Sequence, residues 1–130
     1  MRRFTALTLL VLSALVLPAC GGGSDSSSPP CPPAAETRTA TDGKVTVCAY
    51  DIRYDVETIE AKAGPVEITL INKGAIAHNL SIEGEDFLLD TPSRGKVATK
   101  TITLKPGTYE FLCTISGHAQ AGMKGEIVVS

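Results

Sequence analysis

Between residues 44 and 129, five short segments alternate apolar and polar side chains with a period of two. Glycine or proline bounds most of these segments, which are residues 44–50, 65–72, 99–104, 108–113 and 125–129. A period of two places successive side chains on opposite faces of an extended strand, so we expect each segment to be a β-strand. No long segment has the 3.6-residue period of an amphipathic helix, and only residues 83–95 leave room for a short helical turn. Several short strands at this spacing predict an all-β domain built as a two-sheet sandwich.

The first 19 residues have the layout of a signal peptide. Arg2 and Arg3 precede an apolar run at residues 5–17, which is shorter than the ~20 residues of a membrane-spanning helix. The run ends in LPAC, which resembles a bacterial lipobox, and this resemblance implies cleavage before Cys20 and a diacylglycerol on its sulfur. The alternative is an ordinary secretory signal followed by a chance cysteine. With the lipid, we expect a protein anchored to the extracytoplasmic face of a bacterial membrane without spanning it.

A segment rich in glycine, serine and proline follows, from residue 20 to residue 36. It has few hydrophobic side chains and cannot bury enough surface to fold by itself, so we expect a flexible tether. The remaining ~95 residues suit one small domain with its own core. The predicted organisation is a signal peptide at 1–19, a lipidated cysteine and tether at 20–36, and one domain at 37–130.

The charge of the chain argues against a nucleic-acid partner. The formal net charge is −2, and removal of Arg2 and Arg3 with the signal peptide makes it −4. No basic patch stands out in what remains, whereas nucleic-acid binding requires clustered positive charge.

Three metal-binding residue types lie close together near the end of the chain. The stretch FLCTISGHAQAGMKG contains Cys113, His118 and Met123, with four residues between each and the next. Taken singly, each is more often structural: a buried cysteine, a hydrogen-bonded histidine, a methionine that fills a gap. Once Met1 is removed, however, Met123 is the only methionine, and the chain has only one further histidine, His78, after the strand predicted at 65–72. Two imidazoles, a thiolate and a weak thioether are the ligands of a blue copper site.

The domain at 37–130 resembles the cupredoxins, the small blue copper proteins. The stretch YEFLCTISGHAQAGMKGEIVV is similar to their C-terminal ligand loop, with a Cys-x4-His-x4-Met spacing like that of auracyanins and sulfocyanins. The resemblance implies a Greek-key β-sandwich that holds one type 1 copper ion. It implies His78, Cys113 and His118 as equatorial ligands and Met123 as the axial ligand.

The resemblance also implies contacts around the ligands. Asn79 beside the first histidine is expected to hydrogen-bond near Thr114 and to join the two ligand loops, as such contacts orient ligands and tune the potential. The alternative is an asparagine that only caps its own loop.

Two cysteines remain after the lipid and metal assignments. Outside the cytoplasm, Cys31 and Cys48 are expected to form a disulfide, worth ~3 kcal/mol in the chain-entropy model. This pair is not part of the cupredoxin pattern. Cys48 alternates with the valine and alanine beside it, so we expect its side chain on the outer face of its strand.

The expected function is the transfer of single electrons between transient redox protein partners by a monomer. An enzyme is not expected, because copper oxidases and nitrite reductases need further histidines and both histidines here are used at one site. The alternative is an extracytoplasmic copper chaperone or storage protein, although such proteins often offer several methionines or histidines. A third interpretation is a cupredoxin-like module without metal. Small residues near His118, including Ala121, are expected to form a docking face for the redox partner.

Overall fold

The computed structural model describes residues 29–130. These residues contain strands and no helix, and so no helix that could cross a membrane. The expected signal peptide, the lipidated Cys20 and the first part of the tether lie outside the described residues. The strands are β1 (Ala35–Thr39), β2 (Lys44–Tyr50), β3 (Arg53–Tyr54), β4 (Val56–Ala61), β5 (Gly64–Asn72), β6 (His78–Ile82), β7 (Leu88–Thr91), β8 (Val97–Leu104), β9 (Gly107–Leu112) and β10 (Lys124–Val129).

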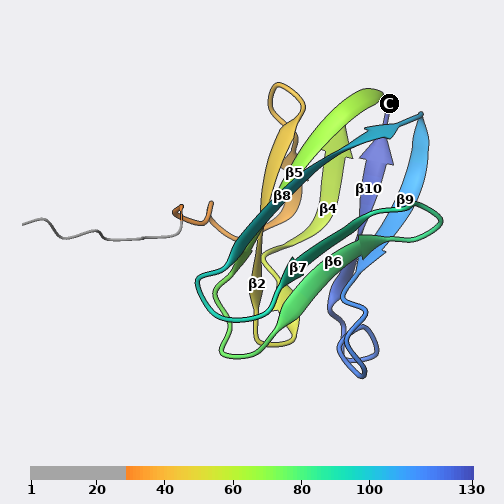
Figure 1. The fold of residues 1–130 in the computed structure, drawn as a ribbon. Coiled ribbons are helices and arrows are strands. Elements are labelled where there is room, and N and C mark those ends of the chain that lie inside the picture. The colour runs from red at the N-terminus through yellow and green to blue at the C-terminus, as the bar shows by residue number, and fades with distance from the viewer. Residues whose placement is uncertain (1–28) are drawn as a thin grey trace, which may run out of the picture.

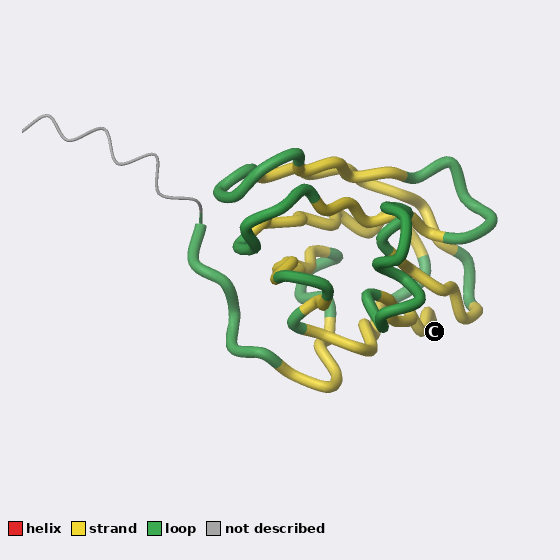
Figure 2. The backbone as a smooth tube through the Cα atoms, turned by 90° about the horizontal axis from the view of Figure 1, so that it is seen from below, coloured by secondary structure: helices red, strands yellow, loops and turns green. Residues whose placement is uncertain are grey.

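The strands form two sheets that pack face to face (Figure 1). One sheet has six strands in the order β1-β4-β10-β9-β6-β7, and the other has four in the order β3-β2-β5-β8. β4 is parallel to β1 and to β10, and β2 is parallel to β5, whereas the other pairs are antiparallel. In the view from below, the loops at one end of the sandwich come to the front (Figure 2). The predicted all-β, two-sheet sandwich is confirmed.

The five segments with a clear period of two correspond to β2, β5, β8, β9 and β10. The other strands were not predicted from the pattern. In β4, Val56 and Ile59 are both buried although they are three residues apart, so the apolar residues do not alternate. No helical turn forms at residues 83–95 because that segment contributes β7, whose alternate residues Leu89 and Thr91 are buried.

The space between the sheets is filled by apolar side chains from both. The largest that are fully buried come from the central strands, namely Phe111, Ile59, Ile68, Leu70, Leu80, Ile82 and Ile127. Gly125 at the start of β10 leaves room for one of them, because a Cβ atom there would overlap the Phe111 ring and the Glu57 carbonyl oxygen. The core thus holds the end of β9, from which the chain continues to Cys113.

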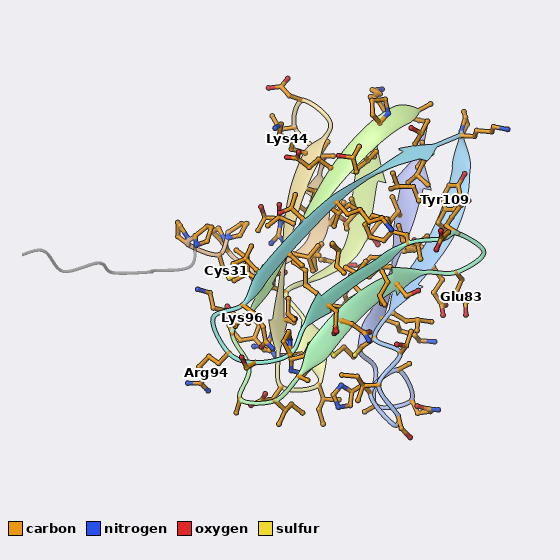
Figure 3. The ribbon with its side chains drawn as sticks, in the orientation of Figure 1. Cys31, Lys44, Glu83, Arg94, Lys96 and Tyr109 are labelled. Carbon is orange, nitrogen blue, oxygen red and sulfur yellow. A yellow bond between two sulfur atoms is a disulfide. The ribbon has the colours of Figure 1, made fainter. Side chains whose placement is uncertain are left out.

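The segment before β1 is held against the domain. Figure 3 shows Cys31 beside the four-stranded sheet, where a disulfide joins it to Cys48 of β2. Cys48 lies on the outer face of its strand, as expected, because Val45, Val47 and Ala49 belong to the core between the sheets and Cys48 does not. Its side chain is nevertheless fully buried, because the disulfide brings the segment around Cys31 against that face. The first strand begins at Ala35, two residues before the boundary expected from composition.

A buried ion pair supports the same segment. Arg38 of β1 donates two hydrogen bonds to the Asp55 carboxylate, at 3.2 and 3.1 Å, and also donates to the Pro33 and Thr46 carbonyl oxygens at 2.8 and 2.6 Å. The Asp55 carboxylate also accepts the backbone N–H of Cys48 at 2.8 Å. One carboxylate thus connects β1, β2 and the disulfide.

Candidate metal centre

Neighbouring strands bring Cys113 and His78 to the same end of the sandwich. His78 is the first residue of β6, and Cys113 directly follows β9. The two strands are antiparallel with Ser81 opposite Leu112, so the chain leaving β9 runs toward the start of β6. The segment before β6 and the loop after β9 therefore lie together, at the lower end in Figure 1.

Backbone hydrogen bonds fold the loop after β9 back on itself. The N–H of Met123 donates to the His118 carbonyl oxygen at 3.0 Å, and the N–H of Cys113 donates to the Met123 carbonyl oxygen at 3.1 Å. Gly117 and Gly122 have φ angles of 85° and 105°, a region that favours glycine, so the loop can reverse twice. The loop thereby returns His118 to the side of Cys113.

Three donors meet at this point. The ligand atoms of His78, Cys113 and His118 all lie within 4.8 Å of one another. The Cys113 Sγ is 3.4 Å from the His118 Nδ1, and the two imidazole centroids are 5.2 Å apart. His78 and Cys113 have no exposed surface and His118 is 8% exposed, so water has little access to the three donors.

The His78 ring lacks the hydrogen bonds that a buried imidazole normally makes. Neither Nδ1 nor Nε2 has a hydrogen-bond partner among the described residues, which costs ~1–3 kcal/mol for an unsatisfied buried group. Burial lowers the pKa of His78, against the opposing effect of nearby Asp51, so the ring is held neutral. A neutral imidazole with a free nitrogen is the form that binds a metal. Together with a thiol and a second imidazole, it fits one copper ion.

Hydrogen bonds connect the two ligand-bearing segments. The Asn79 side chain donates to the Thr114 hydroxyl at 2.8 Å and accepts the Thr114 N–H at 2.8 Å, the contact that the family resemblance implied. The Tyr54 hydroxyl donates to the Asn79 carbonyl oxygen at 2.5 Å. Burial, and secondarily the charge of Cys113, raises the pKa of Tyr54, so its hydroxyl remains a proton donor. The residues that follow both ligands are therefore fixed to each other.

Met123 lies at the end of the same loop. It is fully buried and belongs to the same core cluster as Cys113. Its backbone position is set by His118 and Cys113, as described above. Its role as axial ligand stays a prediction.

Comparison with known proteins decides the family. The model of the family described as "Cupredoxin-like domain" matches residues 12–129. The chain belongs to this family. A search of the curated proteins finds no match.

Solved structures share the cupredoxin-like fold. Dithionite-reduced auracyanin from the photosynthetic bacterium Roseiflexus castenholzii is 23% identical, with a TM-score of 0.63 over 70% of this chain and 98% of that one. Auracyanin B is 22% identical, with a TM-score of 0.57 over 67% and 88%. Reduced rusticyanin is 26% identical, with a TM-score of 0.59 over 73% and 85%. In this cupredoxin-like domain, His78, Cys113 and His118 form a site that fits one copper ion.

Some residues near the cupredoxin-like site were not found from the sequence. Asp51 follows β2 and its Oδ1 is 3.6 Å from the His78 Nε2. Tyr54 of β3 reaches Asn79 from the other sheet. Neither residue is part of a motif or spaced regularly from the ligands, so only the folded chain identifies them.

Proposed function

We propose that this protein is a membrane-anchored type 1 blue copper protein that carries single electrons between redox partners outside the cytoplasm. The observation that carries the proposal is the convergence of His78, Cys113 and His118 at one buried point of a cupredoxin-like fold. A copper ion bound there supplies one-electron chemistry, since thiolate favours Cu(I) and imidazole serves both Cu(I) and Cu(II).

The residues around the site support a rigid centre. The paired hydrogen bonds of Asn79 and Thr114 hold the start of β6 against the loop after β9. The loop itself is closed by the backbone bonds between Cys113, His118 and Met123. Donors that keep their positions need little reorganisation when the charge at the centre changes, which favours fast electron transfer.

The same burial argues against the alternative of a copper chaperone. Transfer of a metal between proteins requires ligands that a partner can reach, whereas His78 and Cys113 have no exposed surface. Catalysis at a second copper is not proposed either, since the chain has two histidines and both lie at this site.

Copper loading tests the proposed function. Full-length protein purified in detergent is freed of metal, mixed with one equivalent of Cu(II), and titrated with a reductant while visible absorption is recorded. We expect an intense blue band that bleaches on reduction and returns on oxidation. A colourless protein that binds Cu(I) would instead support a chaperone, and a protein without copper affinity would reject both functions.

Small residues around His118 are proposed to form the docking face. Ala121 and Gly122 are exposed beside His118, whose 8% exposure makes it the most accessible of the three donors. Ala121→Glu places a charge there, so we expect electron self-exchange to slow by about tenfold or more, since like charges repel at the contact of two copies. The rate is measured from NMR line widths in mixtures of the reduced and oxidised protein.

The matched control for this charge is Thr103→Glu. Thr103 is exposed on β8 and pairs with Pro65, at the opposite end of that strand from the site. The self-exchange rate of Thr103→Glu should equal that of the wild type, and the visible spectra of both variants should match the wild-type spectrum. Equal rates for the wild type and Ala121→Glu would contradict the docking face.

The lipid anchor is proposed from the LPAC sequence and Cys20. Cys20→Ser removes the sulfur that the LPAC sequence predicts to be lipidated, so the protein should move from the membrane fraction to the soluble fraction after cell lysis. Immunoblots of the two fractions measure this, and the intact mass should lose the diacylglycerol. A protein that stays soluble with and without Cys20 would support an ordinary secretory signal.

A further inference from the structure

Asp51 is the charged group that lies next to the His78 ring. Its Oδ1 is 3.6 Å from the His78 Nε2, longer than a hydrogen bond but within the range of an ion pair. The two histidine nitrogens lie on different sides of the ring, so the one that faces Asp51 is turned away from a shared metal. This leaves Nδ1 as the nitrogen for the group formed with Cys113 and His118.

The Asp51 carboxylate is held in place by the loop that leads to His78. Its Oδ1 accepts the backbone N–H of Ala75 at 2.7 Å. The Asp51 side chain is 54% exposed, and an ordinary aspartate is ionised at neutral pH, so Oδ1 is a negatively charged oxygen. A fixed charge thus lies beside a buried, neutral ring.

Gly74 allows the two groups to face each other. A Cβ atom at Gly74 would overlap the Asp51 Oδ1 and lie 2.7 Å from the His78 Nε2. The glycine is buried, and its own N–H bonds to the Asn72 side chain at 2.9 Å and the Ala49 carbonyl oxygen at 3.1 Å, so the backbone cannot easily move aside. Any side chain at this position would separate the carboxylate from the imidazole.

We propose that Asp51 is a positioning residue of the metal centre, whose carboxylate keeps the His78 proton on Nε2 and so leaves Nδ1 free to bind the metal. The inference rests on the proposed copper site. The physical reason is that a negative oxygen attracts the N–H of a neutral imidazole, and that an imidazole carries only one such proton. Carboxylates that accept the second N–H of a ligand histidine fix both the tautomer and the ring orientation.

The tautomer can be measured without any metal. Since the chain has two histidines, 15N-histidine labelling gives only four ring signals, and correlation with the ring protons separates the two tautomers. In metal-free full-length protein, we expect His78 to be almost wholly in the Nε2–H form. Asp51→Ala should shift the ratio of the two tautomers severalfold, since it removes the negative oxygen that faces the His78 Nε2. Asp51→Asn should retain most of the preference, because its amide oxygen can replace the carboxylate oxygen.

The matched control is Asp42→Asn. Asp42 is exposed before β2, whereas Asp51 follows that seven-residue strand, so the two lie about 20 Å apart. Removing the charge there should leave the tautomer ratio unchanged. A wild type with mixed His78 tautomers, or the same ratio in wild type and Asp51→Ala, would overturn the proposal.

The copper-loaded protein gives a second measurement. Removing the negative charge beside a ligand favours the less positive Cu(I), so Asp51→Asn and Asp51→Ala should both shift the Cu(I)/Cu(II) equilibrium three- to tenfold toward Cu(I), where tenfold equals about 59 mV. Asp42→Asn should change it by less than twofold, since salt screens the distant charge. A wild-type protein without a blue band would contradict the proposed copper function. The role of Asp51 would then still be tested by the tautomer ratio of His78 in the metal-free protein. Equal potentials in wild type and Asp51→Ala would count against that role.

Discussion

Replacing Cys113 with serine is expected to abolish the blue absorption of the copper-loaded protein. The band arises from charge transfer between a thiolate and Cu(II), and a serine oxygen cannot supply it. Serine is nearly the same size, and Cys113 is fully buried at the end of β9, so the fold should persist. Replacing a residue that only hydrogen-bonds a ligand lowers metal affinity by up to about 100-fold. Because Cys113 is itself a proposed ligand, its loss should lower copper affinity by more than that. Visible spectra and competition with a copper chelator measure the two effects.

The control removes sulfur elsewhere in the same protein. The double variant Cys31→Ser/Cys48→Ser deletes the disulfide, so it should lose ~3 kcal/mol of stability yet retain the blue band. If Cys113→Ser still formed a blue protein, the thiolate would have to come from another cysteine and the proposed centre would be wrong.

The second large effect is expected on stability, from Asp55→Ala. The carboxylate is 1% exposed and pairs with the 12%-exposed Arg38 side chain, and it also accepts the Cys48 N–H. Alanine would leave a largely buried guanidinium without a counter-ion and a buried N–H without an acceptor. Breaking such a pair costs ~3 kcal/mol or more. The midpoint of urea unfolding, measured on full-length metal-free protein, should fall accordingly.

Glu67→Ala provides the matched control. Glu67 also forms an ion pair, with Lys44 at 3.1 Å, but the Glu67 side chain is 37% exposed and the Lys44 side chain is 68% exposed. Lys44 is labelled in Figure 3 near the upper end of the sandwich, away from the ligand loops. An exposed pair contributes less than about 1 kcal/mol. Similar losses for the two variants would mean that burial of Arg38 and Asp55 does not matter.

Strands could be predicted where the side chains alternate strictly. The segment at 44–50 was predicted with the bounds of β2, because apolar Val45, Val47 and Ala49 occupy every second position. In the structure, these three side chains are buried. β6 and β7 were not predicted, since each has at most five residues and lies among glycines and acids that are typical of loops. Burial of Cys48 could not be predicted either, because it depends on a segment outside the strand pattern.

The candidate site divides in the same way. Cys113, His118 and Met123 were found because one loop carries them, and His78 because histidines are rare in this chain. Asp51 and Gly74 were not found as neighbours of His78, because an aspartate after a strand and a glycine in a turn are common in any β-protein.

The sequence by itself determined the residue types and the class of the protein. Donor identity, spacing within one loop and the period of the strands are local properties, and the resemblance to cupredoxins depends on them alone. The tertiary structure decided how distant segments meet. β6 pairs with β9, which brings His78 to Cys113, and the turn after β2 places Asp51 beside the same ring. Such contacts depend on which strands become neighbours and on how loops pack between them, and no local pattern of residues encodes that choice.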